Sequence, residues 1–358
     1  MLSLPTGPSA LVRPTRPTTP QPTTASPSSS KIDLIRSFSP SKVFKNHTPD
    51  TPITSISYDI AGQYLLSSGT DETLQLYDVP KGRHLKSIYS KKYGCHLAIF
   101  SNTSHSKCLF ASTKENHIIR FLDLNDNSFI RYFKGHSEQV TSLVNSTSGT
   151  RLESFYSSSL DGTVKCWDMR TDSFTASLGL SSTPLIALDP SNSVMAILET
   201  GSKTLRLVSM EKFPTGLIRS VDLTDPLGST TPKKLEFTND NKYIVINTDG
   251  DHLVLDSFSL QVTGLLTGQV PFTPRSYPDS GNLTVTPNGK IAIAGSGNGE
   301  LLIWDLSMVS NGEKLTPTGR ILPKMEAKVI PRMVLFNPQY EMLTTADTEV
   351  GFWVRTSN

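Results

Sequence analysis

The sequence predicts an all-β fold, a propeller of seven blades that follows a disordered N-terminal tail. Three observations support this prediction: a strand ending that recurs at nearly constant spacing, a polar turn that stays in register with it, and a first segment of different composition. The recurring unit spans 41 to 49 residues, which is typical of a four-stranded propeller blade.

The recurring ending is a β-prone segment that closes in an aromatic residue or leucine, most often followed by aspartate. LQLYDV at 74–79 and VKCWDM at 164–169 are two examples. Seven such endings indicate seven blades. The equivalent positions after the aromatic residue are Asp78, Asp123, Asp168, Ser209, Asp256, Asp305 and Val354.

Polar turns precede these endings by about 17 to 20 residues. They are rich in the Asn, Asp, Gly and Pro residues that favour tight hairpins. Each turn is flanked by alternating β-prone residues, so a blade should run strand, hairpin, strand, short turn, strand and fourth strand. The clearest turns lie at 59–63, 189–193, 238–242, 286–290 and 337–341.

The N-terminal segment differs in kind from the rest of the chain. Residues 1–30 contain seven Pro, six Ser and six Thr, and no acidic or aromatic residue. Such a segment buries too little apolar surface to offset its ordering entropy. A transit peptide is the main alternative, but seven prolines oppose the amphipathic helix that it requires. We therefore predict a disordered tail over 1–30 and the propeller over 31–358.

Closure of the ring needs a strand from the start of the propeller. Only four residues follow Val354, which leaves no length there for a fourth strand in the last blade. An N-terminal strand would complete that blade and remove the open sheet edge. We expect residues from about 33 to 46 to pair beside the strand at 351–355.

The third unit resembles a complete WD40 repeat. It contains Gly135-His136, then SLDGT at 159–163, then Trp167-Asp168. The resemblance implies a seven-bladed WD40 propeller in which a hydrogen-bonded chain of His136, Ser159, Asp161 and Trp167 holds this blade together. The other units are degenerate, and Gly69 stands where the first unit should carry the serine. The implied role of these residues is structural, not catalytic.

A longer resemblance covers roughly residues 32 to 355. The stretches 88–136, 159–170 and 234–250, and the ending Gly351-Phe352-Trp353, are similar to the WD-repeat protein eighty-two / Swd-two family. That family implies a non-catalytic nuclear scaffold of the COMPASS complex, which methylates lysine four of histone three. Its implied partners are the methyltransferase catalytic subunit and other COMPASS subunits, the cleavage and polyadenylation factor, and phosphorylated C-terminal repeats of RNA polymerase II.

Composition adds few functional constraints. The net charge of +2 gives no general attraction to nucleic acid or anionic membrane, and no apolar run approaches a bilayer span. A soluble protein without direct sequence-specific nucleic-acid binding is expected. Cys95, Cys108 and Cys166 form no disulfide or zinc pattern, and they are predicted to be buried or half-buried thiols. No catalytic motif, metal site or cofactor is predicted.

Lys91, Lys92, Tyr93 and Lys134 are the candidate partner-binding residues. They fall in loops between blades, where charge-assisted hydrogen bonds could hold a phosphorylated or acidic peptide. The alternative is an ordinary solvated basic loop. Two long connections at 211–232 and 261–280 are either partner contacts or tolerated insertions. For the whole chain, the alternative function is a WD40 substrate receptor or adaptor of another nuclear complex, such as a ubiquitin ligase.

Overall fold

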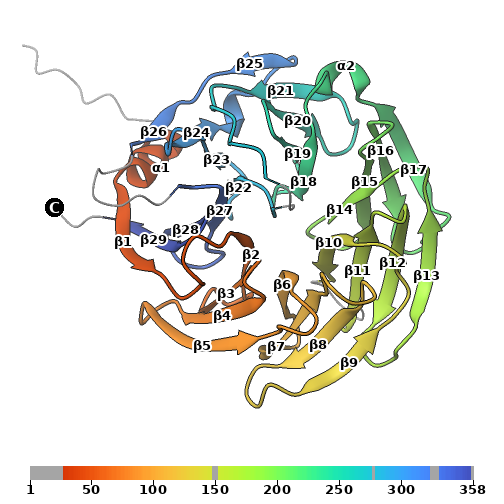
Figure 1. The fold of residues 1–358 in the computed structure, drawn as a ribbon. Coiled ribbons are helices and arrows are strands. Elements are labelled where there is room, and N and C mark those ends of the chain that lie inside the picture. Colours follow the sequence, from red (N-terminus) through yellow and green to blue (C-terminus); the bar gives the residue numbers. More distant parts are fainter. Residues whose placement is uncertain (1–26, 147–151, 276–278, 323–329, 356–358) are drawn as a thin grey trace, which may run out of the picture.

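The computed structural model describes residues 27–146, 152–275, 279–322 and 330–355. Within these ranges the chain forms seven sheets arranged as blades around a central axis (Figure 1). The predicted all-β propeller of seven blades is therefore confirmed. Residues 1–26 of the predicted tail lie outside the described residues.

Strand order is the same in the first four blades, running outward from the axis in sequence order. The strands of blades 1 and 2 are β2 (Ile53–Tyr58), β3 (Tyr64–Gly69), β4 (Thr73–Asp78), β5 (Arg83–Tyr89), β6 (His96–Ser101), β7 (Ser104–Ala111), β8 (Ile119–Asp123) and β9 (Phe129–Phe133). Those of blades 3 and 4 are β10 (Val140–Asn145), β11 (Ser154–Ser159), β12 (Thr163–Asp168), β13 (Phe174–Gly179), β14 (Pro184–Leu188), β15 (Val194–Glu199), β16 (Thr204–Ser209) and β17 (Leu217–Asp222).

The last three blades each take a strand or helix from elsewhere in the chain. Blade 5 gains a fifth, parallel strand on its outer edge, and blade 7 receives β1. The strands of blade 5 are β18 (Pro232–Phe237), β19 (Tyr243–Thr248), β20 (His252–Asp256), β21 (Val262–Leu266) and β25 (Glu313–Leu315). Blades 6 and 7 comprise β22 (Leu283–Val285), β23 (Ile291–Gly295), β24 (Leu301–Asp305), β26 (Gly319–Ile321), β27 (Met333–Phe336), β28 (Met342–Ala346), β29 (Val350–Arg355) and β1 (Phe38–Phe44).

The predicted polar turns close the first hairpin of their blades. In blade 1 the carboxylate of Asp59 accepts a hydrogen bond from the Tyr64 amide at 2.7 Å. In blade 4 Asp189 does the same for Val194, also at 2.7 Å. A short polar side chain that caps the next strand's first amide explains why Asp and Thr recur at these positions.

The hydrophobic core is distributed between blades. Seven apolar clusters occur among the described residues, and each joins two adjacent blades. The middle strands are buried on both faces, which is why β15 reads VMAILE and β19 reads YIVINT with continuous rather than alternating burial. Every blade therefore depends on both neighbours for its burial.

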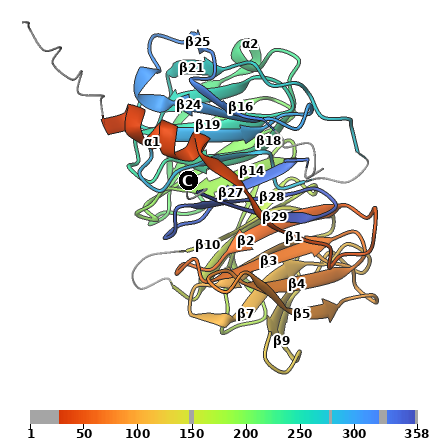
Figure 2. The same ribbon diagram turned by 90° about the vertical axis from the view of Figure 1, so that its left-hand side faces the viewer.

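The ring closes as predicted. Strand β1 pairs antiparallel with β29, from Phe38 opposite Arg355 to Phe44 opposite Val350. Figure 2 shows β1 beside β29, with helix α1 (Pro27–Arg36) leading into it. The sequence did not predict α1, because its ten residues are too short to show helical periodicity. Its first turn occupies the last four residues of the segment predicted as tail. Ile32 and Ile35 pack it onto blade 6.

The two long connections are shorter than predicted. Segment 211–232 contains β17, the outer strand of blade 4, and the one-turn helix α2 (Thr224–Leu227). Segment 261–280 begins with β21, the outer strand of blade 5. The prediction failed because β17 is almost entirely exposed and β21 contains Gly264, so neither shows the continuous apolar pattern of a buried strand. A 3₁₀ turn, η2 (Leu306–Met308), lies instead in the connection that supplies β25.

All three cysteines are free thiols, buried at Cys95 and Cys108 and half-buried at Cys166, which confirms their predicted environment. Across the described ranges no helix combines the length and apolar character needed to cross a membrane. Nor does this part of the chain group three or more His, Cys, Asp or Glu side chains in a way that suits a metal ion.

Candidate functional site

A buried chain of hydrogen bonds runs through blade 3. The indole Nε1 of Trp167 donates to Ser157 Oγ at 2.8 Å, and Ser157 Oγ lies 2.7 Å from His136 Nε2. His136 Nδ1 lies 2.9 Å from the carboxylate of Asp161. Because the ionised carboxylate of Asp161 only accepts, His136 Nδ1 carries the proton. Nε2 of the neutral ring then accepts from the Ser157 hydroxyl, which itself accepts from the indole.

The serine of this chain is Ser157, so the prediction of Ser159 is wrong by two residues. Ser159 donates instead to the backbone carbonyl of Glu138 at 2.9 Å and accepts from the Asp161 amide. Residues two apart on a strand face the same side, so both serines lie on the same face of β11. Only the pairing of β11 with β12, which sets Phe155 opposite Trp167, decides which hydroxyl reaches the indole.

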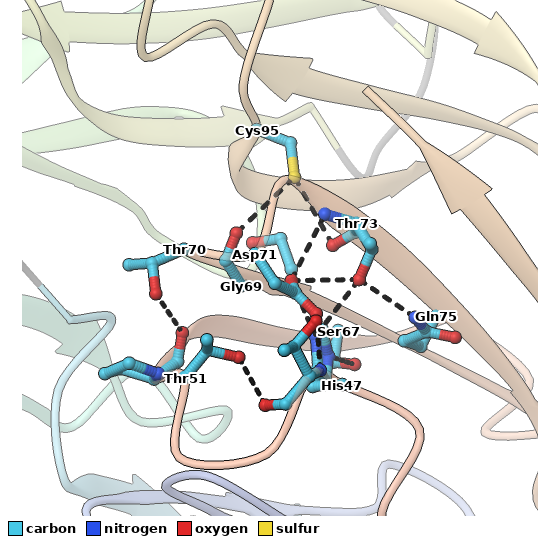
Figure 3. Close-up of polar contacts among 12 residues, drawn as sticks. His47, Thr51, Ser67, Gly69, Thr70, Asp71, Thr73, Gln75 and Cys95 are labelled. Atoms are coloured by element: carbon cyan, nitrogen blue, oxygen red, sulfur yellow. Dashed lines mark hydrogen bonds and ion pairs between the residues drawn. The ribbon is translucent and has the colours of Figure 1, made fainter. Parts of the chain in front are cut away.

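Blade 1 repeats the arrangement, as Figure 3 shows. His47 Nδ1 lies 3.0 Å from Asp71, and His47 Nε2 lies 2.8 Å from Ser67 Oγ. Ser67 is the equivalent of Ser157, because it pairs with Gln75 as Ser157 pairs with Lys165. The expectation that Gly69 interrupts the chain in this blade is therefore wrong, for the same two-residue reason.

The electrostatics of both chains are those of buried structural groups. Burial alone would raise the pKa of Asp161, but hydrogen bonds from Thr163 and His136 outweigh it and bring the pKa to about 2. The same balance, with His47 as the main donor, gives Asp71 a pKa of about 2. Burial lowers the pKa of His136. In blade 3 a neutral imidazole, a carboxylate and a fully buried serine are thus bound to one another within the blade.

The central cavity has one acidic side chain, Asp279, among its described lining residues. It has a volume of about 370 Å³ and is lined by innermost strands of six blades. Its charged side chains are already paired, since Lys233 lies 3.5 Å from Asp279 and Lys234 lies 2.7 Å from Glu236. The rest of the lining is mainly apolar or hydroxyl-bearing.

Three of the candidate partner-binding residues lie together between β5 and β6. Lys91 and Lys92 are exposed and Tyr93 is half-buried. The ammonium of Lys92 lies 5.2 Å from the centre of the Tyr93 ring. The ammonium of Lys91 lies 5.8 Å from the ring of Tyr89, which is itself 68% exposed. The loop therefore exposes two lysine ammonium groups, each close to the ring of a tyrosine.

Lys134 occupies the equivalent loop of the next blade. It is exposed and follows β9, directly before Gly135 and His136. Both loops lead from an outer strand to the innermost strand of the following blade, so they open on the same face of the ring. The described structure records no contact that joins Lys134 to Lys91 or Lys92.

Sequence reasoning missed Arg120, the residue on which Tyr93 rests. The guanidinium carbon of Arg120 lies 3.4 Å from the centre of the Tyr93 ring. Arg120 is only 3% exposed, which is unusual for arginine. The available signal was its position in IRFLD at 119–123, which matches Arg206 in LRLVS at 205–209.

Comparison with known proteins places these features in a family. A model of the WD domain, G-beta repeat matches residues 38–78 and 127–168. COMPASS component SWD2 of Saccharomyces cerevisiae is 35% identical over 305 residues, covering 85% of this chain and 91% of that protein. Set1 complex component swd2 of Schizosaccharomyces pombe is 32% identical, covering 90% and 98%. The chain belongs to the SWD2 family of WD-repeat proteins.

The SWD2 family also includes an animal relative that matches this chain over a similar length. WD repeat-containing protein 82 of Drosophila melanogaster is 30% identical over 334 residues, covering 90% of this chain and 96% of that protein. The two segments that match the WD-repeat model contain the two buried chains, with His47 and Asp71 in the first and His136, Asp161 and Trp167 in the second. The recognisable repeats are thus the blades that these hydrogen bonds hold together.

Proposed function

We propose that this protein is a non-catalytic scaffold subunit of a Set1/COMPASS-type complex that methylates lysine four of histone three in the nucleus. The observation that carries the proposal is similarity along nearly the whole chain to two proteins named as components of COMPASS and of the Set1 complex. The structure supports a scaffold, since its His, Asp and Ser side chains serve the blades internally.

Depletion of the chain tests this proposal. Trimethylation of lysine four of histone three should fall, because the assembly loses a structural subunit, and re-expression of the wild-type chain should restore it. Methylation of lysine thirty-six serves as a control that the depletion should not change. Unchanged methylation at lysine four after full depletion would contradict the proposal.

We further propose that the same protein joins the cleavage and polyadenylation factor and contacts phosphorylated C-terminal repeats of RNA polymerase II. Support comes from the family resemblance in the sequence and from the exposed cations of Lys91 and Lys92. The exposed Lys134 on the same face extends this candidate surface.

A charge reversal tests the second proposal. The Lys91→Glu/Lys92→Glu double variant should stay folded, since exposed loop substitutions usually change stability by no more than about 0.5 kcal/mol. It should lose binding to a phosphorylated repeat peptide, with a smaller difference at high salt because exposed charges are screened. Lys242→Glu, in a hairpin of the opposite face, is the matched control. Equal binding by both variants would place the contact elsewhere.

A further inference from the structure

Arg120 lies in an aromatic niche at the outer side of blade 2. Its guanidinium carbon is 3.4 Å from the ring centre of Tyr93, 5.1 Å from that of Tyr132 and 5.6 Å from that of Phe129. Its Nε donates a hydrogen bond to Ser112 Oγ at 2.8 Å. Three rings and one hydroxyl thus hold the guanidinium in a fixed orientation.

This cation lacks a counter-charge. Among the residues that the structure describes, no carboxylate lies within ion-pair distance of Arg120, and its two Nη groups donate to none of them. Burial lowers the pKa of Arg120, and electrostatic attraction from Tyr93, Tyr132 and the more distant Glu115 opposes this without offsetting it. Arginine stays protonated in proteins, so Arg120 carries a positive charge whose Nη donors have no carboxylate partner among the described residues.

Blade 4 contains the same cation with its anion supplied. Arg206 in β16 pairs with Ile197 as Arg120 in β8 pairs with Phe110. Two residues further along, blade 4 has Glu199, whose carboxylate lies 2.6 Å from Arg206. The equivalent residue in blade 2 is Ser112. Blade 2 therefore has a guanidinium like that of blade 4, with a hydroxyl where blade 4 has the carboxylate.

The outer strand differs between the two blades in a related way. Tyr132 lies opposite Arg120, whereas Ser220 lies opposite Arg206. Tyr132 is 39% exposed and Tyr93 is half-buried, so the aromatic walls of the niche reach the surface. Lys92 adds a second cation over the Tyr93 ring.

We infer that Arg120 binds an oxyanion carried by a partner protein, a side-chain phosphate or carboxylate that enters between Tyr93 and Tyr132. In the complex this oxyanion pairs with the Arg120 guanidinium as the Glu199 carboxylate pairs with Arg206 in blade 4. Guanidinium matches either group with two parallel hydrogen bonds, and the rings pack against the groups next to it. The inference deepens the proposed surface of Lys91, Lys92 and Tyr93.

The competing explanation is that Arg120 has only a structural role and stabilises the three surrounding aromatic side chains through cation–π attraction. The two explanations differ in what happens when a carboxylate is supplied within the chain. If the niche is an anion site, Ser112→Glu should fill it, as Glu199 does in blade 4. If Arg120 is only structural, the wild-type chain does not bind anions at this site, and Ser112→Glu leaves anion binding unchanged.

The test is a titration of the purified chain with phenyl phosphate and, separately, with benzoate. The arginine Nε–Hε signals are followed by NMR, and the Arg120 signal is assigned by its loss in Arg120→Gln. We expect a saturable shift of the Arg120 signal and none of the Arg206 signal, which is the internal control. The stronger of the two ligands identifies the oxyanion as phosphate or carboxylate.

Variants complete the test, with binding followed by the ligand's own NMR signals because Arg120→Gln and Arg120→Lys lack the Arg120 signal. Ser112→Glu and Arg120→Gln should each weaken binding by about tenfold or more, because a charge-assisted pair is lost. Arg120→Lys keeps the charge and should retain part of the affinity, which covers the case in which Ser112→Glu fails to fold. No saturable shift with either ligand, or equal binding in Arg120→Gln, would overturn the inference. Since the chain is tested alone, such a result would leave the scaffold proposal standing.

Discussion

Trp167 and His136 in blade 3 meet through one hydroxyl, that of Ser157. The chain continues to Asp161, which also caps the amides of Ser137 and Thr163. Each member satisfies a polar group that would otherwise be buried without a partner, and that absence costs about 1–3 kcal/mol per group. Loss of any one of these side chains therefore leaves another polar group of the blade without a partner, and we expect large losses of stability from substitutions here.

Trp167→Ala should be severely destabilising. The variant removes a fully buried ring that packs on Phe133 and Phe155. Truncation of a core aromatic typically costs about 3–5 kcal/mol. Urea unfolding of the two proteins measures the difference, and a loss below about 1 kcal/mol would mean that Trp167 does not hold the blade.

Ser157→Ala should cost more stability than Ser159→Ala. Without the Ser157 hydroxyl, both His136 Nε2 and Trp167 Nε1 lose their partner, which we expect to cost about 2–4 kcal/mol in total. Ser159→Ala removes two partly buried bonds, one to the Glu138 carbonyl and one from the Asp161 amide, and should cost about 1–2 kcal/mol. Side-by-side denaturation checks the order, and the reverse order would restore Ser159 to the chain.

Acid should weaken blades 1 and 3, the two blades in which a histidine is hydrogen-bonded to an aspartate. The folded-state pKa values of Asp71 and Asp161, about 2, lie below the ordinary value of 3.8. Their stabilisation, about 2 kcal/mol each, is therefore complete above about pH 5 and is lost as the pH falls toward 2. The lowered pKa of His136 acts in the same direction.

Denaturation series from pH 5 down to pH 2 measure this effect. Asp161→Asn should be less stable than wild type at pH 5 and should show a shallower decline, because it has no carboxyl proton to take up at this position. Parallel curves for the two proteins would show that Asp161 has an ordinary pKa in the folded state.

The sequence identified His136, Asp161 and Trp167 but chose the wrong serine for physical reasons. A shift of two residues keeps every side chain on its original face, so no burial pattern distinguishes Ser157 from Ser159.

Arg120 was missed for a similar reason. Its environment is made by Tyr93 and Tyr132, which come from different strands and loops, and only the folded blade brings them around it.

At the scale of elements, α1 and β1 form the closing unit of the ring. Phe38 in β1 is buried with Ile32 and Ile35 of α1, against blades 6 and 7. Phe44 packs edge-on against Phe352 at 4.9 Å between ring centres, and it also contacts Tyr77 of blade 1. The strand could be predicted because a propeller must cover its last edge. The helix could not, because its helical pattern depends on only two buried isoleucines.

Two deletions test the closing unit. Removal of residues 1–26 should leave the thermal midpoint unchanged, since that sequence has few apolar residues to bury. Removal of residues 1–44 should lower it strongly and promote aggregation, because β29 becomes an open edge and burial of Phe38, worth about 3–5 kcal/mol, is lost. Equal midpoints for the two truncated proteins would show that β1 does not close the ring.

At the scale of the whole molecule, the seven blades form a closed ring (Figure 1). The spacing of the strand endings was enough to predict this architecture, because each unit repeats the same burial between two neighbours. Partner choice lies in loop residues such as Lys91 and Lys92, whose spacing follows no repeat. Family membership, supported by similarity along most of the chain, therefore contributes more to the proposed function than the fold does.

The proposed function of this ring is that of a structural subunit of a Set1/COMPASS-type complex. Its most direct test is quantitative mass spectrometry of the tagged chain purified at its natural level, with another tagged WD40 propeller as the control. We predict enrichment of a SET-domain methyltransferase and its companion subunits in near-constant proportion to the chain. Recovery of ubiquitin-ligase subunits in that proportion, with no methyltransferase above the control, would contradict the claim.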